Sequence, residues 1–569
     1  MMQPDEVSNT ALEAPRPTQG EPFKLDCAGS TLPVAHLPAT HNLRSIEELL
    51  VKVTQGLEAK NILISWFGRH TTAPEPAGVI AAAVLLTPDG LQVLRAHVPA
   101  GQSGYPSLTV KFPAAQIFER ELWEQTGLQP EGHPWLKPVR FEGMRQQHLD
   151  DYPFFKVRGA EVHEVGVGPI HAGVIEPGHF RFMCHGEQVH HLEIQLGYQH
   201  RAVEALLLQK PPQRLSPLVE SIVGDSVLAY SWAFNAALES LADRPVAQAE
   251  QASRAIGLEL ERVAMHLATL TGLATDIAYL QPAGTYQRLR TAIINASQRV
   301  CGNRFGKGWI RPGASAPIGE ALRADLLNTL RAFQTDFVQV NALVSSSRST
   351  QARFKGVGTV STQAALDIGL TGVVARASGV ACDLRRALPD GLYAAHPPEL
   401  IMQSTGDCWA RARQRMLEAE ASTQWLIDRL ADPTLNLADT PAPFAKTVVA
   451  HQCNDPSLGS QTDTPASLAE TVGADTHAAK PDSAGTTPAG TAGWTLQANA
   501  LCVSLVEGVR GPVMVALETD ASGQLIHAKV QDPSLANWFG LAFALRDQQI
   551  SDFPICNKSF DLSYCGNDL

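Results

Sequence analysis

The side chains best suited to proton exchange in this sequence are two histidines and a glutamate, His171, Glu176 and His179, in one turn rich in glycine and proline. After the turn, apolar and polar positions partly alternate over residues 180–194, a pattern typical of half-buried strands. Gly186-Glu187 stands where a hairpin between two such strands would reverse. Binding and catalytic residues often lie on connections of this kind, so we expect chemistry at this hairpin.

The cysteines do not form a metal-binding or redox motif in the sequence. There are nine, no C-x-x-C occurs, and Cys556 and Cys565 form the most closely spaced pair. This spacing disfavours a zinc knuckle, an iron–sulfur site and a redox dithiol, so we expect structural, mostly buried thiols. His190 and His191 are consecutive and would point to opposite faces of a strand, which argues against their sharing a metal ion.

Length and charge limit the classes of function. The 569 residues should form more than one domain, and 44% hydrophobic residues are enough for substantial cores. With 45 basic and 57 acidic residues the net charge is −12, which disfavours nucleic acid as a partner. We find no apolar run long enough for a transmembrane segment and no signal-peptide core at the N-terminus. We therefore expect a cytoplasmic protein, with docking on a membrane partner left open.

The patterns predict an α+β fold with five segments. Residues 1–39 are expected to be a disordered leader, and 453–492, rich in Ser, Thr, Ala, Gly, Asp and Pro, a flexible insertion. Residues 40–157 should form a small N-terminal α+β domain, and 158–452 together with 493–569 a second domain. The first domain should contain an N-capped helix starting near Ser45 and strands in 61–66, 79–86 and 91–97.

Helical periodicity dominates the middle of the chain. Apolar residues keep helical spacing over 249–270, 285–300, 317–343 and 407–430, which predicts a helix bundle behind the hairpin. Strand-like runs return at 513–517 and 525–530. Glu259, Arg262 and His266 fall on one helix face, where they should make architectural contacts.

Two stretches resemble a known family. Residues 168–182, 184–187 and 196–204 are similar to the opening of the 49-kDa (D-type) subunit of respiratory complex I and of the large subunits of energy-converting nickel–iron hydrogenases. Residues 118–127 with 132–136 resemble the signature of the 30-kDa (C-type) subunit of complex I. The fused order is characteristic of formate-hydrogenlyase-type large subunits, such as the hydrogenase-4 component G type. The resemblance implies a nickel–iron-hydrogenase large-subunit-like second domain, with a hairpin sheet and a helix bundle.

The resemblance also shows which metal ligands are missing. A nickel–iron centre needs four thiolates, which the family supplies as two C-x-x-C pairs. Here the early positions carry Val223 and Ser226, and the late positions carry Ser563 and Gly566. Cys565 lies between the two late positions and has no partner cysteine in the motif. We therefore expect no metal centre in this chain.

Complex I also lacks these cysteines and uses the vacated cavity for the head of its quinone. A quinone carbonyl needs a donor that can release a proton, which suits tyrosine or histidine. Tyr230 is the nearest tyrosine but stands on the hydrogenase histidine position, while His171 matches the first histidine of the hairpin motif. The quinone-contacting histidine of complex I aligns with Pro177. Quinone binding is therefore left open, and the candidate catalytic residues include Tyr230 and His171.

Two acidic residues complete the candidate site. Glu176 resembles the glutamate that passes protons in hydrogenases, although a solvent-exposed turn acid is the favoured interpretation. Asp225 lies in the stretch that replaces the early cysteines. An open pocket lined by Tyr230, His171 and Asp225 would favour chemistry in the vacated cavity. A filled, apolar cavity would favour a structural role.

The resemblance implies an electron-transfer and coupling subunit of a membrane-associated oxidoreductase complex, without hydrogenase activity of its own. We expect no cofactor on this chain, and a 4Fe–4S cluster on a B-type iron–sulfur small subunit. H-type and antiporter-like membrane subunits would attach it to the inner face of the cell membrane. No G-x-G-x-x-G turn occurs, so any NADH would be bound by another subunit. The alternatives are a non-catalytic coupling subunit and, more remotely, a true nickel–iron hydrogenase.

Overall fold

The computed structural model describes residues 23–24, 35–36, 40–73, 75–142, 152–159, 161–171, 175–437 and 494–569. The expected insertion at 453–492 and most of the expected leader lie outside these residues. Two short strands are described within the leader. Strand β1 (Phe23–Lys24) pairs in parallel with β14 (Val380–Ala381), and β2 (Ala35–His36) pairs antiparallel with β15 (Leu501–Gly508).

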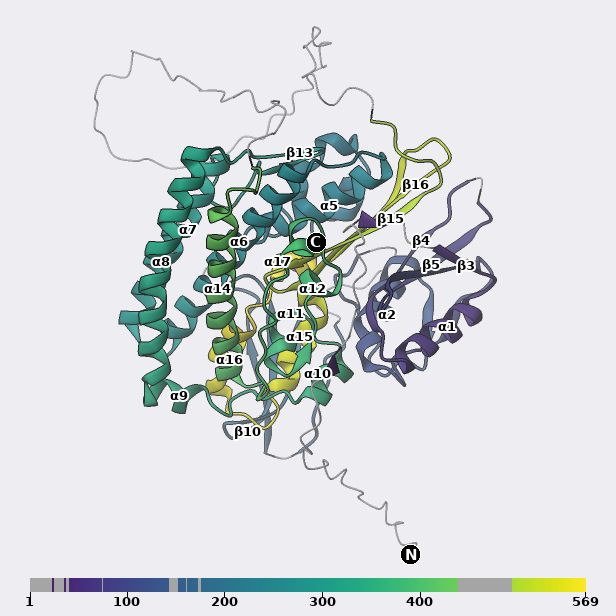
Figure 1. The fold of residues 1–569 in the computed structure, drawn as a ribbon. Helices are drawn as coiled ribbons and strands as arrows, with labels where there is room; N and C mark the ends of the chain where they lie inside the picture. Colours follow the sequence, from purple (N-terminus) through teal and green to yellow (C-terminus); the bar gives the residue numbers. More distant parts are fainter. Residues whose placement is uncertain are drawn as a thin grey trace, which may run out of the picture.

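The N-terminal domain is a four-stranded sheet with two helices on one face (Figure 1). Its strands run in the order β3-β6-β5-β4, with bounds Thr40–Leu43, Gly90–Pro99, Gly78–Thr87 and Ile62–His70. Helix α1 (Ile46–Glu58) begins where the sequence predicts, because the Ser45 hydroxyl accepts the N–H of Glu48 at 3.4 Å. Helix α2 (Gln116–Thr126) packs beside it. The three predicted strands and the helix are confirmed.

The other face of this sheet packs on a second sheet. Apolar residues of β4, β5 and β6 share a core with β15 and β16 (Gly511–Thr519). The second sheet has the order β17-β16-β15-β2, with β17 at Leu525–Gln531. The N-terminal domain is therefore held to the rest of the chain by sheet-on-sheet packing.

A helix bundle forms the part of the molecule farthest from the N-terminal domain (Figure 1). Its long helices are α6 (Gln248–Asp276), α7 (Leu280–Cys301), α8 (Glu320–Ser346) and α14 (Cys408–Ala431). These four confirm the helices predicted from apolar periodicity. Helix α5 (Val227–Leu241) lies between the bundle and β15.

The hairpin is also confirmed. Strands β10 (His179–His185) and β11 (Gln188–Gln195) reverse at Gly186-Glu187, and β9 (Val162–Val167) completes the sheet in the order β11-β10-β9. His190 is exposed and His191 buried, as expected for opposite faces. The chain ends in α15 (Pro533–Ala544), α16 (Phe553–Phe560) and α17 (Tyr564–Asp568). The predicted α+β class is correct.

Buried charges hold the two domains together. The Lys529 ammonium group in β17 lies 2.7 Å from the Glu121 carboxylate in α2 and 3.0 Å from Glu204. Arg140 also pairs with Glu121. Glu121, Arg140 and Lys529 are at most 3% exposed, so each charge depends on its partners rather than on water.

We predict that Lys529→Met destabilises the folded chain by about 3 kcal/mol, because it leaves buried carboxylates short of a counter-ion. Chemical denaturation of the purified chain measures this change. Arg288→Met is the matched control, since the Arg288–Asp336 pair is exposed and should contribute little. Equal effects of the two substitutions would contradict the prediction.

Helix α5 is capped from outside its own segment. Its N-cap residue, Ser226, makes no side-chain cap. The Glu261 carboxyl group of α6 instead accepts the N–H groups of Leu228 at 2.7 Å and Ala229 at 3.3 Å. Burial raises the pKa of Glu261 to about 8, and the nearby Asp225 charge adds to the rise, although the two N–H groups oppose it.

The raised pKa of Glu261 predicts a pH-dependent contribution to stability. Because its pKa is higher in the folded chain than the ordinary 4.5, this contribution is present near pH 4.5 and is lost as the pH rises toward 8. Glu261→Gln keeps the capping oxygen but cannot titrate. We predict that the melting temperature of the variant minus that of wild type increases as the pH is raised from 5 to 8. A difference that stays flat over this range, as expected for the exposed control Glu320→Gln, would refute it.

Candidate functional site

The stretches that replace the early and late cysteine pairs meet in the fold. Helix α17 lies against the segment that precedes α5, so that Gly566 faces Val223. A Cβ atom built on Gly566 would lie 2.8 Å from Val223 Cγ2 and 2.1 Å from Asp532 Oδ2. A side chain at position 566 would therefore require the Asp532 carboxyl group to shift.

The two serines at the other vacated positions are used in local contacts. Ser563 is the N-cap of α17, where its hydroxyl accepts the N–H of Gly566 at 2.9 Å. Its Oγ is 3.5 Å from Cys565 Sγ. Ser226 is buried, with its Oγ 3.5 Å from Glu261 Oε1. The positions of the four family ligands are thus occupied by one valine, one glycine and two serines.

A tyrosine–aspartate pair lies beside these positions. The Tyr230 hydroxyl, on α5, donates to Asp532 Oδ2, while Asp532 Oδ1 accepts the N–H of Ser534 at 2.6 Å and so caps α15. Tyr230 is only 1% exposed. Burial raises the pKa of Asp532, and burial together with the Asp532 charge raises the pKa of Tyr230 well above its ordinary value. The pair can therefore hold a proton between two buried oxygens.

Arg510 lies next to this pair and joins two further acids. It donates to both oxygens of Asp225, at 2.9 and 2.8 Å, and lies 3.6 Å from Asp561 Oδ2. Arg510 is nearly buried, whereas the Asp225 side chain is 40% exposed, so this ion pair runs from the interior to the surface. Burial opposes ionisation of Asp561, but the charges of Lys558 and Arg510 outweigh it and lower its pKa.

The turn before the hairpin reaches the same place through Glu176. Its carboxylate accepts the N–H of Cys565 at 3.2 Å. Partial loss of its water shell raises the pKa of Glu176, and the negative charge of Asp225 adds to the rise. Burial and Glu176 raise the pKa of Cys565 to about 11, so its thiol keeps its proton at neutral pH.

His171 does not join these residues but contacts the backbone of its own turn. Its Nε2 lies 2.7 Å from the carbonyl oxygen of Gly178, and His179 Nδ1 lies 3.1 Å from that of Gly168. Both rings therefore fasten the turn to itself. The structure brings Tyr230, Asp225 and Glu176 around Arg510, whereas His171 turns to its own loop.

These residues do not line the open pocket that the sequence analysis considered, because Tyr230 is buried and bonded to Asp532. The site is polar, with Tyr230 enclosed while Asp225 and Glu176 reach the surface, and so differs from both of the arrangements expected. Asp532 was missed by sequence reasoning. The available signal was an acid directly before Pro533 and after a strand-like run, which is typical of a helix N-cap.

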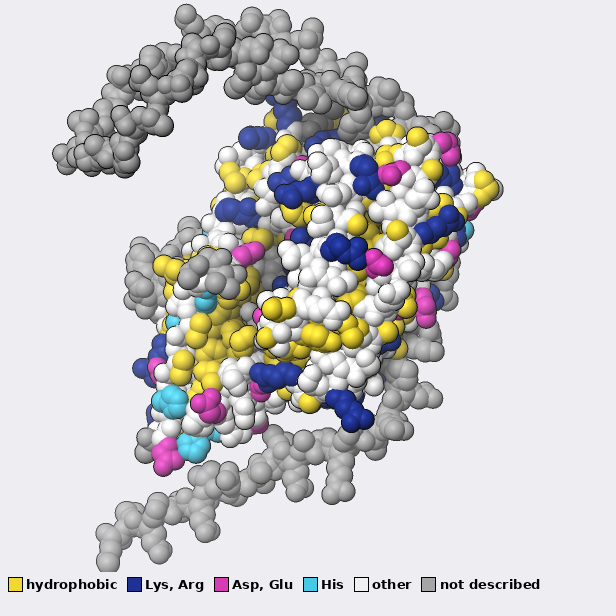
Figure 2. All heavy atoms as spheres, turned by 90° about the vertical axis from the view of Figure 1, so that its left-hand side faces the viewer, with side chains coloured by type: hydrophobic (Ala, Val, Ile, Leu, Met, Phe, Trp, Pro, Cys, Tyr) yellow, Lys and Arg dark blue, Asp and Glu magenta, His cyan; other side chains and the backbone are white. Residues whose placement is uncertain are grey.

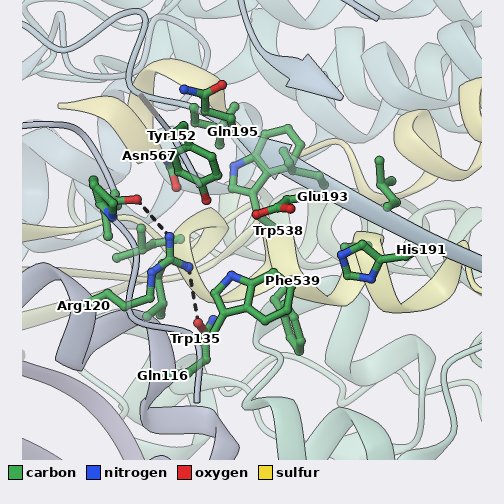
Figure 3. Close-up of a pocket in the computed structure, with 18 of the residues that line it drawn as sticks. Gln116, Arg120, Trp135, Tyr152, His191, Glu193, Gln195, Trp538, Phe539 and Asn567 are labelled. Carbon is green, nitrogen blue, oxygen red and sulfur yellow. Dashed lines mark hydrogen bonds between the residues drawn. The ribbon is translucent and has the colours of Figure 1, made fainter. Parts of the chain in front are cut away.

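A separate cavity of about 70 Å³ lies where α2, β11 and α15 meet (Figure 3). Arg120, Trp135, His191 and Trp538 are among its lining residues, and Arg120 donates to the carbonyl of Pro138 at 2.9 Å. None of the four predicted site residues lines it. This cavity is therefore distinct from the Tyr230 site.

The residues around Tyr230 do not fit a nickel–iron centre. Cys565 is the one sulfur at the four vacated positions or between them. Over the described part of the chain, no group of three or more His, Cys, Asp or Glu side chains is arranged to hold a metal ion. In the same residues, no helix is both long and apolar enough to cross a bilayer.

Both parts of the chain match models of known protein families. Residues 276–568 match the model of the 49 Kd subunit of respiratory-chain NADH dehydrogenase. Residues 44–154 match the model of the 30 Kd subunit of the same enzyme. The two modules are fused in one chain, as the sequence analysis expected.

The similar proteins include subunits of NADH-quinone oxidoreductase and of hydrogenase-type complexes. The chain is 31% identical to the D-type subunit of NADH-quinone oxidoreductase from Clostridium beijerinckii over 42% of this chain and 65% of the relative. It is 30% identical to formate hydrogenlyase subunit 5 from Escherichia coli, covering 57% of this chain and 61% of the relative.

Hydrogenase-4 component G from E. coli matches along more of the sequence, with 25% identity over 84% of this chain and 78% of the relative. The chain thus spans somewhat less than two thirds of the C. beijerinckii protein and of formate hydrogenlyase subunit 5, and more of component G. From the family match over residues 276–568, the chain belongs to the family of the 49 Kd subunit of respiratory-chain NADH dehydrogenase, with a 30 Kd-subunit module fused ahead of it.

Proposed function

We propose that this chain is an electron-transfer and coupling subunit of a membrane-associated oxidoreductase complex, and that it works without a nickel–iron centre. The relatives named as subunits of NADH-quinone oxidoreductase, hydrogenase-4 and formate hydrogenlyase support the first part. The second part rests on one observation: the four positions at which the family carries thiolates hold Val223, Ser226, Ser563 and Gly566.

These four residues argue against a nickel site on chemical grounds, and the packing around Gly566 shows that the fold has no room for a cysteine there unless Asp532 shifts. A cysteine at position 566 would place its Cβ atom within 2.1 Å of Asp532 Oδ2. Nickel also prefers soft thiolate ligands, and neither Val223 nor Gly566 offers a donor side chain. A hydroxyl group, as on Ser226 and Ser563, is a poor substitute for a thiolate.

In place of metal ligands, the site holds a donor, an acceptor and a cation. Tyr230 can donate to an electron-accepting carbonyl and release its proton, while Asp532 can take up or return that proton. Arg510 places a guanidinium group beside them, with its charge shared between Asp225 and Asp561. A quinone has this chemistry, and because Tyr230 is 1% exposed it would reach the hydroxyl group only after a conformational change.

The second candidate is a non-catalytic coupling subunit. It is favoured by the 1% exposure of Tyr230, which leaves no open path to the hydroxyl group in this conformation. In that role the polar site would transmit conformational change between partner subunits.

The proposed partners follow from the family. Electrons would arrive from a 4Fe–4S cluster on a B-type iron–sulfur small subunit, since the sequence offers no C-x-x-C motif for one. H-type and antiporter-like subunits would attach the chain to the inner face of the cell membrane. Figure 2 shows a band of hydrophobic side chains on one face, beside histidine and acidic side chains, and contiguous apolar surface is typical of subunit contacts.

Substitutions at the tyrosine–aspartate pair separate the two candidates. In the intact complex, with reduced methyl viologen as donor and a short-chain quinone as acceptor, we predict that Tyr230→Phe and Asp532→Asn each lower turnover at least about tenfold. Subunit composition should stay unchanged. The matched control is Tyr286→Phe, which removes a buried tyrosine hydroxyl that donates to Asn341 in the helix bundle. Full turnover in both Tyr230→Phe and Asp532→Asn would support the non-catalytic role instead.

A further inference from the structure

Two cysteines far apart in sequence are in contact in the core. Cys408 is the first residue of α14 and Cys556 lies in α16, and their sulfur atoms are 3.6 Å apart. Both side chains are completely buried. The spacing of the cysteines in the sequence disfavours a redox dithiol, because no closely spaced pair occurs. The fold nevertheless brings together two cysteines that are 148 positions apart.

A buried arginine is directed at one of the two sulfurs. Arg411 Nη2 lies 3.3 Å from Cys408 Sγ, and its other N–H groups donate to Ser559 Oγ and to the carbonyl oxygens of Gly358 and Gly406. Arg411 is fully buried. Among the residues that the structure describes, no carboxylate forms an ion pair with it, and a buried cation needs an anion. A thiolate at Cys408 supplies one.

The surroundings of Cys408 favour a negative charge on its sulfur. Cys408 Sγ accepts the Arg411 N–H at 3.3 Å, and a thiolate at Cys408 would also accept the Cys556 S–H across the 3.6 Å contact, in which either sulfur can be the donor. Cys408 stands at the N-terminus of the 24-residue helix α14, which further favours a negative charge there. Burial opposes ionisation, but Cys556 and Arg411 outweigh it and lower the pKa of Cys408. The bond to Cys408, together with burial, raises the pKa of Cys556.

The two acids near the pair have partners of their own, whereas Arg415 bonds only through Nη2 among the described residues. Asp407 caps α14 by accepting the N–H of Ala410 at 2.7 Å. Asp552 pairs with Arg353 at 2.6 Å. Arg415 donates to the carbonyl oxygens of Ser559 and Phe560. Arg411 is therefore the charged group that contacts a sulfur of the pair directly, through Cys408.

We propose that Cys408 and Cys556 form a redox-active dithiol, which hydrogen peroxide or another small hydroperoxide oxidises to an intramolecular disulfide. The Cys408 thiolate attacks one peroxide oxygen, so that an S–O bond forms, the O–O bond breaks and hydroxide leaves. Cys556 gives up its proton and attacks the Cys408 sulfur, and the S–O bond breaks as the S–S bond forms. Two thiols lose two electrons, and the peroxide becomes two waters.

The disulfide would change the structure near the Tyr230 site. Its formation needs the sulfurs to approach from 3.6 Å to about 2.05 Å, and it ties the start of α14 to α16. Helix α16 leads directly into Asp561, which contacts Arg510. Oxidation also removes the negative charge beside Arg411, whose guanidinium group lies 4.3 Å from the centre of the Phe560 ring. The oxidation state of the pair would thus act on α16 and the residues after it.

Peroxide titration of the intact complex tests the proposal. The sample is quenched with catalase, unfolded in an alkylating agent without reductant, and digested for mass spectrometry. We expect a peptide linked through Cys408 and Cys556 that has lost two hydrogens and that dithiothreitol releases. Cys502 is the internal control, because it is buried and burial raises its pKa to about 12. It should stay reduced at the same peroxide dose.

Two variants assign the roles within the pair. In Cys556→Ser, Cys408 should gain oxygen instead of forming a disulfide. In Cys408→Ser, Cys556 should stay reduced over the same interval. The proposal is overturned if wild type shows no linked peptide while the complex stays assembled, or if Cys502 is oxidised as fast as Cys408. Equal oxidation of Cys556 with and without Cys408 would overturn the assignment of the nucleophile.

Discussion

The contact between Gly566 and the Asp532 carboxyl group is the constraint on which the candidate site depends. Because position 566 has no side chain, α17 can lie directly against Asp532 and Val223. This placement brings Cys565 to Glu176 and puts Ser563 at the helix N-cap. It also leaves Asp532 free to accept the Tyr230 proton. A polar arrangement around a buried tyrosine thereby stands where the family's metal-binding members place four thiolates.

The surrounding core is held by buried charges that satisfy one another. Arg376 pairs with Glu418 and Glu507, and Glu418 also lies 3.0 Å from His266. Burial lowers the pKa of His266 to about 4, so it is neutral at physiological pH although it contacts a carboxylate. These pairs join α6, α11 (Gly372–Ala377), α14 and β15, the elements that surround the site. Such networks fix the positions of their members, because a buried charge that lost its partner would have neither a counter-ion nor water to stabilise it.

Local pattern was enough to predict most elements but few of the contacts between them. The helix at Ser45, the reversal at Gly186-Glu187 and the four long helices follow from capping and apolar periodicity, which depend on neighbouring residues. The Tyr230–Asp532 bond joins residues 302 positions apart. The Cys408–Cys556 contact spans 148 positions. Contacts of this kind depend on how the elements pack, which periodicity does not specify.

The family resemblance supplied part of what periodicity could not. It predicted that the early and late stretches would meet, and Val223 and Gly566 do so. It did not predict that the His171 ring would hydrogen-bond to the Gly178 carbonyl in its own turn, because a motif match specifies residue identity and not side-chain orientation. It also could not identify Asp532, which enters the site from the end of β17.

Metal analysis of the intact purified complex tests the central claim most directly. Nickel and iron per mole of this chain are measured in one sample, so that iron from partner clusters shows that the metals survived purification. The account predicts iron at the level of those clusters and nickel near zero, because the vacated positions offer no set of thiolates. Nickel at about one per mole would contradict it, and would mean that a ligand set around Cys565 replaces the four cysteines.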